Sequence, residues 1–279
     1  RLTSDDVVHG FAIGHSDRPP VDVRPGEVTD LVLNFGRAGT YTYYCTRWCG
    51  PNHWRMRGTI EVTGFHSALE SLSPALYMTL GIDLDASHSV DAQPQRVPSA
   101  ARGASLGVSI PGEYVAREYA RSHSPLEVWL ALRDDQTMRT GALSDSDVWD
   151  IVALIWRLNT TSETVEMGRL LYAENCAACH GVAGAGDGVM AGVAVDREAL
   201  EDSAAAALRF GHEILEPADL TSADLLGASP ALLQGKVLRG GMGTGMPYWG
   251  PILTDRQTWA LVDYLWTFHF LYEGQWQNE

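Results

Sequence analysis

Four metal-binding side chains lie in one short stretch, Cys45-Thr46-Arg47-Trp48-Cys49-Gly50-Pro51-Asn52-His53-Trp54-Arg55-Met56, which combines two thiols, an imidazole and a thioether. Such soft ligands favour copper. A mononuclear blue-copper site needs one cysteine, so the second cysteine indicates two bridging thiolates and a pair of copper ions. A pair that shares one electron across two thiolates changes its geometry little on oxidation. The stretch therefore predicts an electron relay.

The spacing Cys-x-x-x-Cys-x-x-x-His-x-x-Met resembles the CuA domain of cytochrome c oxidase subunit II and of nitrous-oxide reductase, and His9 stands where that family places its first imidazole ligand. The resemblance implies a cupredoxin-like β-sandwich. It also implies a dinuclear copper centre bound by His9, Cys45, the backbone carbonyl of Arg47, Cys49, His53 and Met56. Because the chain begins close to His9, we expect the first strands of the sandwich to lie upstream.

Other interpretations of these residues stay open. Cys45 and Cys49 could form a disulfide, or bind a structural zinc ion together with His53, or belong to a mononuclear copper site. Neither the disulfide nor the zinc site accounts for Met56, because a thioether is a poor zinc ligand, and neither accounts for His9. The neighbouring Trp48 and Trp54 are candidates for the surface through which electrons leave, or for packing over the site.

A second motif, Cys176-Ala177-Ala178-Cys179-His180, is the Cys-x-x-Cys-His pattern for covalent haem attachment. Two thiols form thioethers to the haem vinyl groups, and the histidine binds the iron from one side. The surrounding sequence resembles a class I cytochrome c. A zinc knuckle or a redox dithiol is the alternative. With two cysteines assigned to copper and two to haem, all four cysteines of the chain are used.

The cytochrome resemblance also implies the remaining haem contacts. The segment that begins at Pro217 resembles the loop whose proline carbonyl accepts a hydrogen bond from the proximal imidazole. Met246, which precedes Pro247, is the expected sixth ligand, with Met242 as the alternative. Histidine–methionine ligation closes both axial positions, and such a haem carries electrons and does not bind oxygen.

Composition limits the function further. The net charge of −15 makes nucleic-acid binding very unfavourable. The acidity either serves solubility or steers a basic redox partner. No run approaches the apolar length of a membrane span, so we expect membrane association only through an upstream segment or partner subunits. Haem c attachment and copper–thiolate sites are typical of a periplasmic or extracytoplasmic protein, and the absence of a signal peptide suggests a mature or trimmed product.

The sequence divides into three parts: a β-rich CuA domain at 1–64, a helical middle domain at 65–160 and an all-α cytochrome c domain at 161–279. We expect strands at Asp30–Phe35, Thr40–Tyr44 and Gly58–Val62.

A weak internal repeat links the two helical domains. The segments from Leu143 to Trp156 and from Leu253 to Trp266 both pair a hydroxyl N-cap with two tryptophans on one helical face. The middle domain lacks cysteine, and Met138 stands roughly where an axial ligand would lie. It is either a degenerate cytochrome c without haem, serving as a spacer or docking surface, or a helical linker.

The whole chain resembles the soluble part of a subunit II fused to a cytochrome c, as in caa3-type oxidases. The resemblance implies an electron-transfer subunit, not catalytic alone, that connects a small electron donor to a terminal oxidase-like respiratory complex. Alternatives are an electron-transfer module of a nitrous-oxide or nitric-oxide reductase or another periplasmic oxidoreductase, a free periplasmic shuttle, and a copper-storage or delivery protein. The inserted middle domain departs from the usual oxidase arrangement.

Overall fold

The computed structural model describes most of the chain. The described residues are 2–3, 7–13, 20–45, 56–64, 75–86, 88, 90–136, 138, 143–191, 217–240 and 246–272. The fold is mixed, with an N-terminal antiparallel sheet followed by helices.

Four strands of the N-terminal region form the main sheet in the order β3-β2-β5-β6. They are β2 (His9–Ile13), β3 (Val21–Val23), β5 (Gly39–Tyr44) and β6 (Arg57–Val62). Two shorter strands, β1 (Leu2–Thr3) and β4 (Val28–Thr29), pair separately. The predicted β-rich N-terminal region is present, and its closure into a cupredoxin sandwich stays a prediction.

Two of the three expected strands form, and one does not. Thr40–Tyr44 lies within β5 and Gly58–Val62 within β6, and these strands pair in an unbroken antiparallel register. The expectation for Asp30–Phe35 is wrong, because this segment has no regular structure. Its burial does alternate, with Val32 78% exposed between less exposed neighbours. Alternation alone predicts which side chains face inward, but it does not establish the regular pairing that defines a strand.

The middle region is helical, as predicted. Its helices are α1 (Leu76–Thr79), α2 (Ala100–Ser105), α3 (Gly112–Val115), α4 (Arg117–Ser122), α5 (Pro125–Asp134) and α6 (Asp145–Asn159). The C-terminal region contains α7 (Ser162–Asn175), α8 (Ala177–His180), the 3₁₀ turn η4 (Ala223–Gly227), α9 (Pro230–Arg239), α10 (Asp255–Leu265) and the 3₁₀ turn η5 (Trp266–Phe268).

The two repeated helices, α6 and α10, begin at the hydroxyl residues that the sequence predicts. Ser144 caps α6 and Thr254 caps α10, and each accepts a hydrogen bond from the backbone N–H three residues on. Gln257 completes the predicted capping box in α10, and Asp147 completes an equivalent one in α6. Such caps satisfy backbone donors that the first helical turn leaves unpaired.

Each repeated helix crosses another helix through a glycine. A side chain on Gly103 of α2 would collide with the carbonyl oxygen of Asp150 in α6, and one on Gly168 of α7 would collide with that of Ala260 in α10. Asp150 directly follows Trp149, just as Ala260 directly follows Trp259. The two close crossings therefore use equivalent positions of the repeat.

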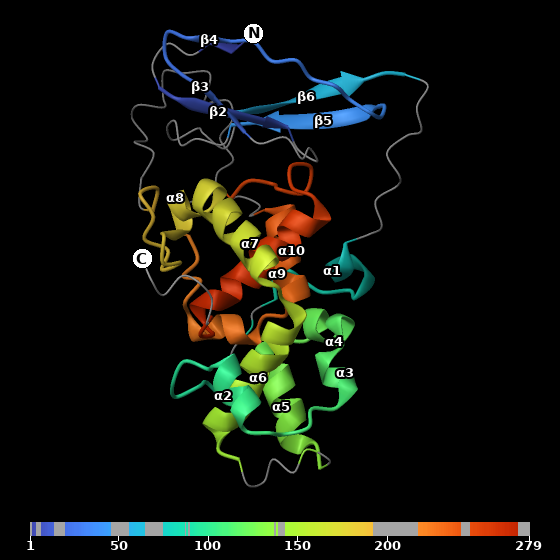
Figure 1. Cartoon of the computed structure of the whole chain (residues 1–279), viewed down its shortest axis with the longest axis vertical. Helices are drawn as coiled ribbons and strands as arrows, with labels where there is room; N and C mark the ends of the chain where they lie inside the picture. The colour runs from blue at the N-terminus through green and yellow to red at the C-terminus, as the bar shows by residue number, and fades with distance from the viewer. Residues whose placement is uncertain are drawn as a thin grey trace.

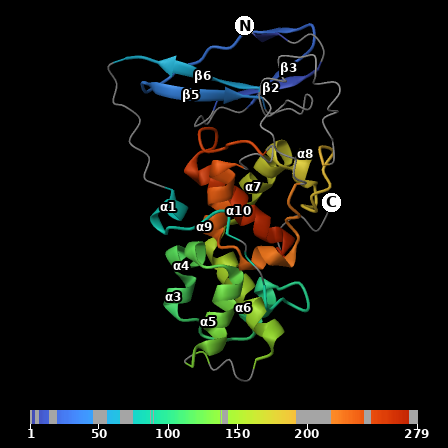
Figure 2. The same cartoon turned by 180° about the vertical axis from the view of Figure 1, so that it is seen from behind.

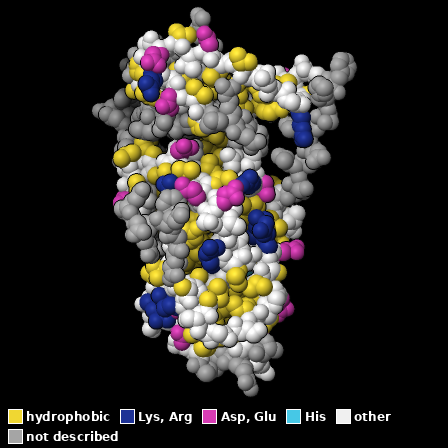
Figure 3. Space-filling model, viewed as in Figure 1, with side chains coloured by type: hydrophobic (Ala, Val, Ile, Leu, Met, Phe, Trp, Pro, Cys, Tyr) yellow, Lys and Arg dark blue, Asp and Glu magenta, His cyan; other side chains and the backbone are white. Residues whose placement is uncertain are grey.

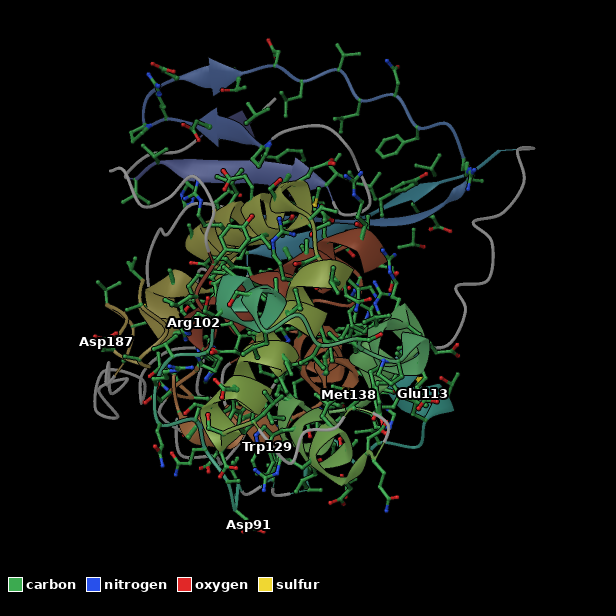
Figure 4. All side chains as sticks on the ribbon, turned by 60° about the horizontal axis from the view of Figure 1, so that its bottom comes forward. Asp91, Arg102, Glu113, Trp129, Met138 and Asp187 are labelled. Atoms are coloured by element: carbon green, nitrogen blue, oxygen red, sulfur yellow. The ribbon has the colours of Figure 1, made fainter. Side chains whose placement is uncertain are left out.

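One hydrophobic cluster joins the two helical regions. Trp156 of α6 packs against Phe270 beyond η5, with ring centroids 5.6 Å apart, and both belong to the same buried cluster. In the middle region, Trp129 stacks on Trp149 at 5.7 Å, and Met138 is 4% exposed; Figure 4 places Trp129 and Met138 within this region. The sulfur of Met138 is thus part of a packed core.

The arrangement of the three parts is the same in both ribbon views. The sheet lies across one end of a column of helices, with α7 to α10 nearer the sheet and α5 and α6 toward the far end (Figures 1 and 2). The end of the helical column that carries α8 therefore faces the sheet. None of the helices in the described part of the chain combines the length and apolarity needed to cross a membrane.

Candidate copper and haem centres

Three of the six predicted copper ligands lie in the described residues, and the sheet brings them to one place. His9 begins β2, Cys45 directly follows β5 and Met56 directly precedes β6. Nδ1 of His9 lies 3.9 Å from Sγ of Cys45. Nitrogen and sulfur atoms that share a metal ion, at bond lengths of about 2.0 and 2.3 Å, lie roughly 3–4 Å apart. The spacing fits two donors to one metal ion.

The strand register explains this convergence. Antiparallel pairing sets Ala12 of β2 opposite Tyr44 of β5. The start of β2, at His9, therefore lies at the same end of the sheet as the end of β5, where Cys45 follows. The amide of Cys45 also donates a hydrogen bond to the carbonyl of Met56, with N and O 2.9 Å apart. The ladder thus continues one step beyond the strands and closes the base of the ligand loop.

The other predicted ligands, Arg47, Cys49 and His53, fall outside the described residues, as do Trp48 and Trp54. Within the described ranges, histidine, cysteine and carboxylate side chains form no group of three that could hold a metal ion. Cys45 is 8% exposed and the Met56 side chain 42% exposed. The full ligand set therefore stays a prediction.

The haem-attachment motif sits at the end of a long helix. The amide of Cys176, the residue after α7, donates to the carbonyl of Tyr172, and the short helix α8 carries the motif to His180. Burial raises the pKa of the Cys176 thiol to about 12 and also raises that of Cys179. Both groups are therefore thiols at neutral pH and form no disulfide. A reactive dithiol needs the opposite shift, toward a thiolate.

The imidazole of His180 is oriented by a hydrogen bond at its Nδ1 atom. Its Nδ1 lies 3.0 Å from the carbonyl oxygen of Ala218, which leaves Nε2 for a metal. Such a bond fixes the tautomer and orients the ring. Burial lowers the pKa of His180, and the Ala218 carbonyl opposes this by raising it. The net lowering favours the neutral imidazole that binds iron.

The expected hydrogen bond from His180 to the Pro217 carbonyl is wrong by one residue. The acceptor is Ala218, and the Pro217 carbonyl instead faces the loop after α8, where it would lie 2.6 Å from a Cβ atom on Gly186. Gly186 has a φ of +75°, which a residue with a side chain rarely adopts. The loop backbone therefore approaches the Pro217 carbonyl so closely that only glycine fits at position 186.

Of the two candidates for the sixth ligand, the structure describes Met246 alone. Met246 is partly buried and packs against the main hydrophobic cluster, whereas Met242 lies outside the described residues. The backbone of Met246 and Pro247 passes so close to Gly240 that a side chain on Gly240 would collide with both carbonyls. This glycine therefore allows the segment to fold back over the end of α9. The choice of Met246 stays a prediction.

Two further contacts in the haem region were not anticipated from the sequence. The hydroxyl of Tyr172 donates to the carbonyl of Gly181 at 2.7 Å, directly after the attachment motif. Nε2 of His269 lies 2.8 Å from the carbonyl of Leu220 and ties the His180-binding loop to the end of η5. The position of Tyr172 one helical turn before Cys176 was a usable signal. Nothing local marks His269, because its partner is distant in sequence.

The sheet contacts the haem-binding region through two neighbouring residues. Tyr44 of β5 packs against the helical core. Burial, and then the nearby Glu174 carboxylate, raise its pKa to about 12. Nη1 of Arg57 in β6 donates to the carbonyl of Tyr248, with N and O 2.9 Å apart. The predicted copper and haem segments are thus adjacent.

Charge on the visible surface is mixed. On the face shown in Figure 3, the coloured acidic side chains lie among lysine and arginine rather than in one patch. Asp187, on the loop after α8, lies at the periphery of the molecule in Figure 4 and is exposed.

Comparison with known proteins agrees with this geometry. The family model for cytochrome c matches residues 165–269. Over 62 residues, which are 22% of this chain, the sequence is 42% identical to each of two cytochrome c oxidase subunit 2 sequences of Thermus thermophilus. The match spans 45% and 36% of these relatives, so the chain covers less than half of their length.

Among solved structures, the reducing HAO-like protein complex of Kuenenia stuttgartiensis aligns with 52% of this chain and 72% of its own. The TM-score is 0.31 at 19% identity, which carries no argument about function. The motif, the helices around it and the family match agree on the C-terminal region. Residues 165–269 form a cytochrome c domain, in a chain with partial similarity to cytochrome c oxidase subunit 2.

Proposed function

We propose that this protein relays electrons between a c-type haem and a dinuclear CuA centre and feeds a terminal oxidase-like respiratory complex. The cytochrome c domain and the similarity to oxidase subunit 2 support an electron-transfer role in such a context. The observation that carries the copper half is the 3.9 Å separation of His9 Nδ1 and Cys45 Sγ, on strands that the register holds side by side.

The residues of the haem half suit a carrier rather than an oxygen-binding haem. The Ala218 carbonyl fixes the tautomer of His180 and leaves Nε2 for the iron. Cys176 and Cys179 supply the thioethers, and Met246 supplies the opposite ligand. With both axial positions taken, such a haem exchanges single electrons.

The copper half supplies a complementary property. His9, Cys45, Cys49, His53, Met56 and the Arg47 carbonyl form the ligand set. A rigid pair of strands beneath this loop limits how far the ligands move when the charge of the site changes. Low reorganisation is what a relay requires, and it gives the antiparallel frame of β5 and β6 a functional purpose.

Location and partners follow from this chemistry. Covalent haem attachment and copper–thiolate ligation favour the periplasmic or extracytoplasmic face of a membrane. The partners are a small electron donor and a larger oxidoreductase that takes the electrons. Because the matched relatives are covered only in part, the identity of the receiving complex belongs to the proposal as well.

The decisive experiment is metal analysis with EPR of the oxidised protein. We expect two coppers per haem and one unpaired electron delocalised over both copper nuclei. Cys49→Ser should remove the delocalised signal and leave the haem spectrum unchanged. Cys176→Ala with Cys179→Ala should do the reverse. One copper with a localised signal, or bound zinc, would contradict the CuA assignment and leave a cytochrome c with a different metal site.

A further inference from the structure

Among the described residues, two that face each other across one ladder, Tyr44 and Arg57, contact the cytochrome domain. Tyr44 ends β5, Arg57 begins β6, and the register sets them directly opposite. Cross-strand neighbours of this kind lie about 5 Å apart and act as a unit. Their two contacts with the helices are therefore one structural feature, although the helical partners are far apart in sequence.

Each member of the pair is covalently next to a predicted copper ligand. Tyr44 directly precedes Cys45, and Arg57 directly follows Met56. The two predicted ligands are themselves joined, because the Cys45 amide donates a hydrogen bond to the Met56 carbonyl. A displacement of the pair would therefore be transmitted to the base of the copper loop with no flexible residue between them.

On the helical side, each member of the pair meets a segment that carries a haem ligand. Tyr44 lies near Glu174, two residues before Cys176. Arg57 donates to the carbonyl of Tyr248, two residues after Met246. The pair thus contacts both segments that would bind the haem: the one that leads to Cys176 and the one that follows Met246.

We infer that Tyr44 and Arg57 are positioning residues that hold the copper-binding end of the sheet against both haem-binding segments and so set the separation of the two centres. This inference rests on the proposed function. Electron transfer through protein weakens steeply with distance, so a fixed separation matters more here than tight binding. Arg57 contributes a directional, charge-assisted hydrogen bond, and Tyr44 contributes buried apolar area.

The test compares matched variants of the full chain carrying both cofactors. Arg57→Gln removes the charged donor, and Tyr44→Leu keeps an apolar side chain but shortens its reach. Controls are Arg24→Gln, at an exposed position of the same domain, and Tyr41→Leu, on the same strand as Tyr44. The rate of electron transfer between haem and copper is measured after a light pulse that reduces one centre, and EPR and haem absorption are recorded for every variant.

Loss of a charge-assisted hydrogen bond should lower the ratio of docked to undocked molecules by about tenfold or more, which slows the transfer to the extent that undocked molecules accumulate. We expect Arg57→Gln and Tyr44→Leu to slow the transfer accordingly, with unchanged spectra of both centres and normal rates in the two controls. An unchanged rate in both variants would overturn the inference. So would a slower rate accompanied by an altered copper EPR signal, because the pair would then act on the ligands and not on the separation.

A second readout keeps this inference separate from the proposed function. Hydrogen exchange of the peptide covering 246–250 is measured in copper-free protein that carries its haem. We expect faster exchange in Arg57→Gln than in the wild type and in Arg24→Gln. If the wild type held no dinuclear copper, the proposed function would fail while this result could still establish the contact. Equal exchange in all three proteins would overturn the contact itself.

Discussion

The middle helical region and the cytochrome c domain are built around the same helix crossing but stabilise it differently. In the middle region the seam between α2 and α6 contains a buried carboxylate: Asp150, 1% exposed, accepts hydrogen bonds from the Ser99 amide and from both Arg96 and Arg102. In the cytochrome domain the seam between α7 and α10 is bridged by Arg256 and Glu163, both exposed.

This difference bears on how each helical region fills its interior. The cytochrome domain has a haem to fill its interior. The middle region, which has no cysteine, fills its interior with Trp129, Trp149 and Met138 and holds α2 in place through the ion pairs of Asp150. We propose that it is a cytochrome-like fold without haem that serves as a spacer or docking surface.

Breaking the buried seam should have the largest effect. Asp150→Ala leaves Arg96 and Arg102 facing a site with no carboxylate and removes the side-chain acceptor of the Ser99 amide. We expect the free energy of unfolding to fall by about 3 kcal/mol, as for other broken buried pairs. Urea denaturation followed by circular dichroism measures this. The matched control is Asp145→Ala, which removes the exposed ion pair with Arg133 and should cost under about 1 kcal/mol.

Adding a methyl group at either glycine crossing should lower the free energy of unfolding by somewhat less. The haem absorption spectrum should distinguish a change in the cytochrome domain from one in the middle region. Gly103→Ala and Gly168→Ala each force a methyl group against a backbone carbonyl, and overpacking of this kind costs about 1–3 kcal/mol. We expect Gly168→Ala to perturb the haem absorption spectrum and Gly103→Ala to leave it unchanged. Gly112→Ala, where nothing lies within 4 Å, is the control. A haem shift in Gly103→Ala would contradict the separation of the two regions.

The seam between the two regions should respond to pH through Asp263 of α10. Burial raises the pKa of Asp263 to about 6, against the favourable influence of Thr164, Arg121 and Arg117. Because the pKa is higher in the folded state, stability falls as pH rises from about 4 to 6, and the loss is complete above pH 6.

Asp263→Asn should therefore raise the free energy of unfolding at pH 7 by roughly 1–2 kcal/mol and change it little at pH 4. Urea denaturation at the two pH values measures this. Asp134→Asn, at an exposed position of α5, should show no such dependence. A loss of stability at pH 7 would mean that the carboxylate is needed beside a cavity of about 60 Å³ that Arg117, Arg121 and Asp263 help to line.

The smallest effect is expected at the exposed seam. Arg256→Gln removes the contact with Glu163, whose nitrogen and oxygen atoms lie 2.6 Å apart. Solvent screens both side chains, so we expect a change below about 0.5 kcal/mol. The measurement is the same denaturation as for Asp150→Ala. An effect as large as that of Asp150→Ala would remove the contrast between the two seams.

The sequence predicts local features well, because each depends on short-range chemistry. The caps at Ser144 and Thr254 are where hydroxyl side chains precede an apolar run. The haem motif stands on its own helix, and the family match to cytochrome c confirms the domain that carries it. The convergence of His9 and Cys45 is not local: it is expected only from the CuA resemblance, and antiparallel pairing of their strands produces it.

The features that could not be predicted depend on contacts between distant segments. The segment Asp30–Phe35 has the alternation of a strand but forms no regular strand, because strand formation also depends on the segments that lie beside it. The acceptor for His180 is Ala218 rather than Pro217, and the position of this loop depends on its close approach to the distant Gly186. No local pattern marks Arg57 as a donor to Tyr248, since their proximity results from how the sheet packs on the helices.

The short junction between α6 and α7 has a mechanical consequence. Asn159 ends α6 and Ser162 begins α7, and both residues between them are held in place. Thr160 is 5% exposed, and its carbonyl accepts a hydrogen bond from Arg157. Thr161 caps α7. The Asn159 side chain also donates a hydrogen bond to the Val115 carbonyl. A torque on the middle region therefore turns the haem domain with it. A partner bound only to the middle region would therefore also orient the cytochrome c domain.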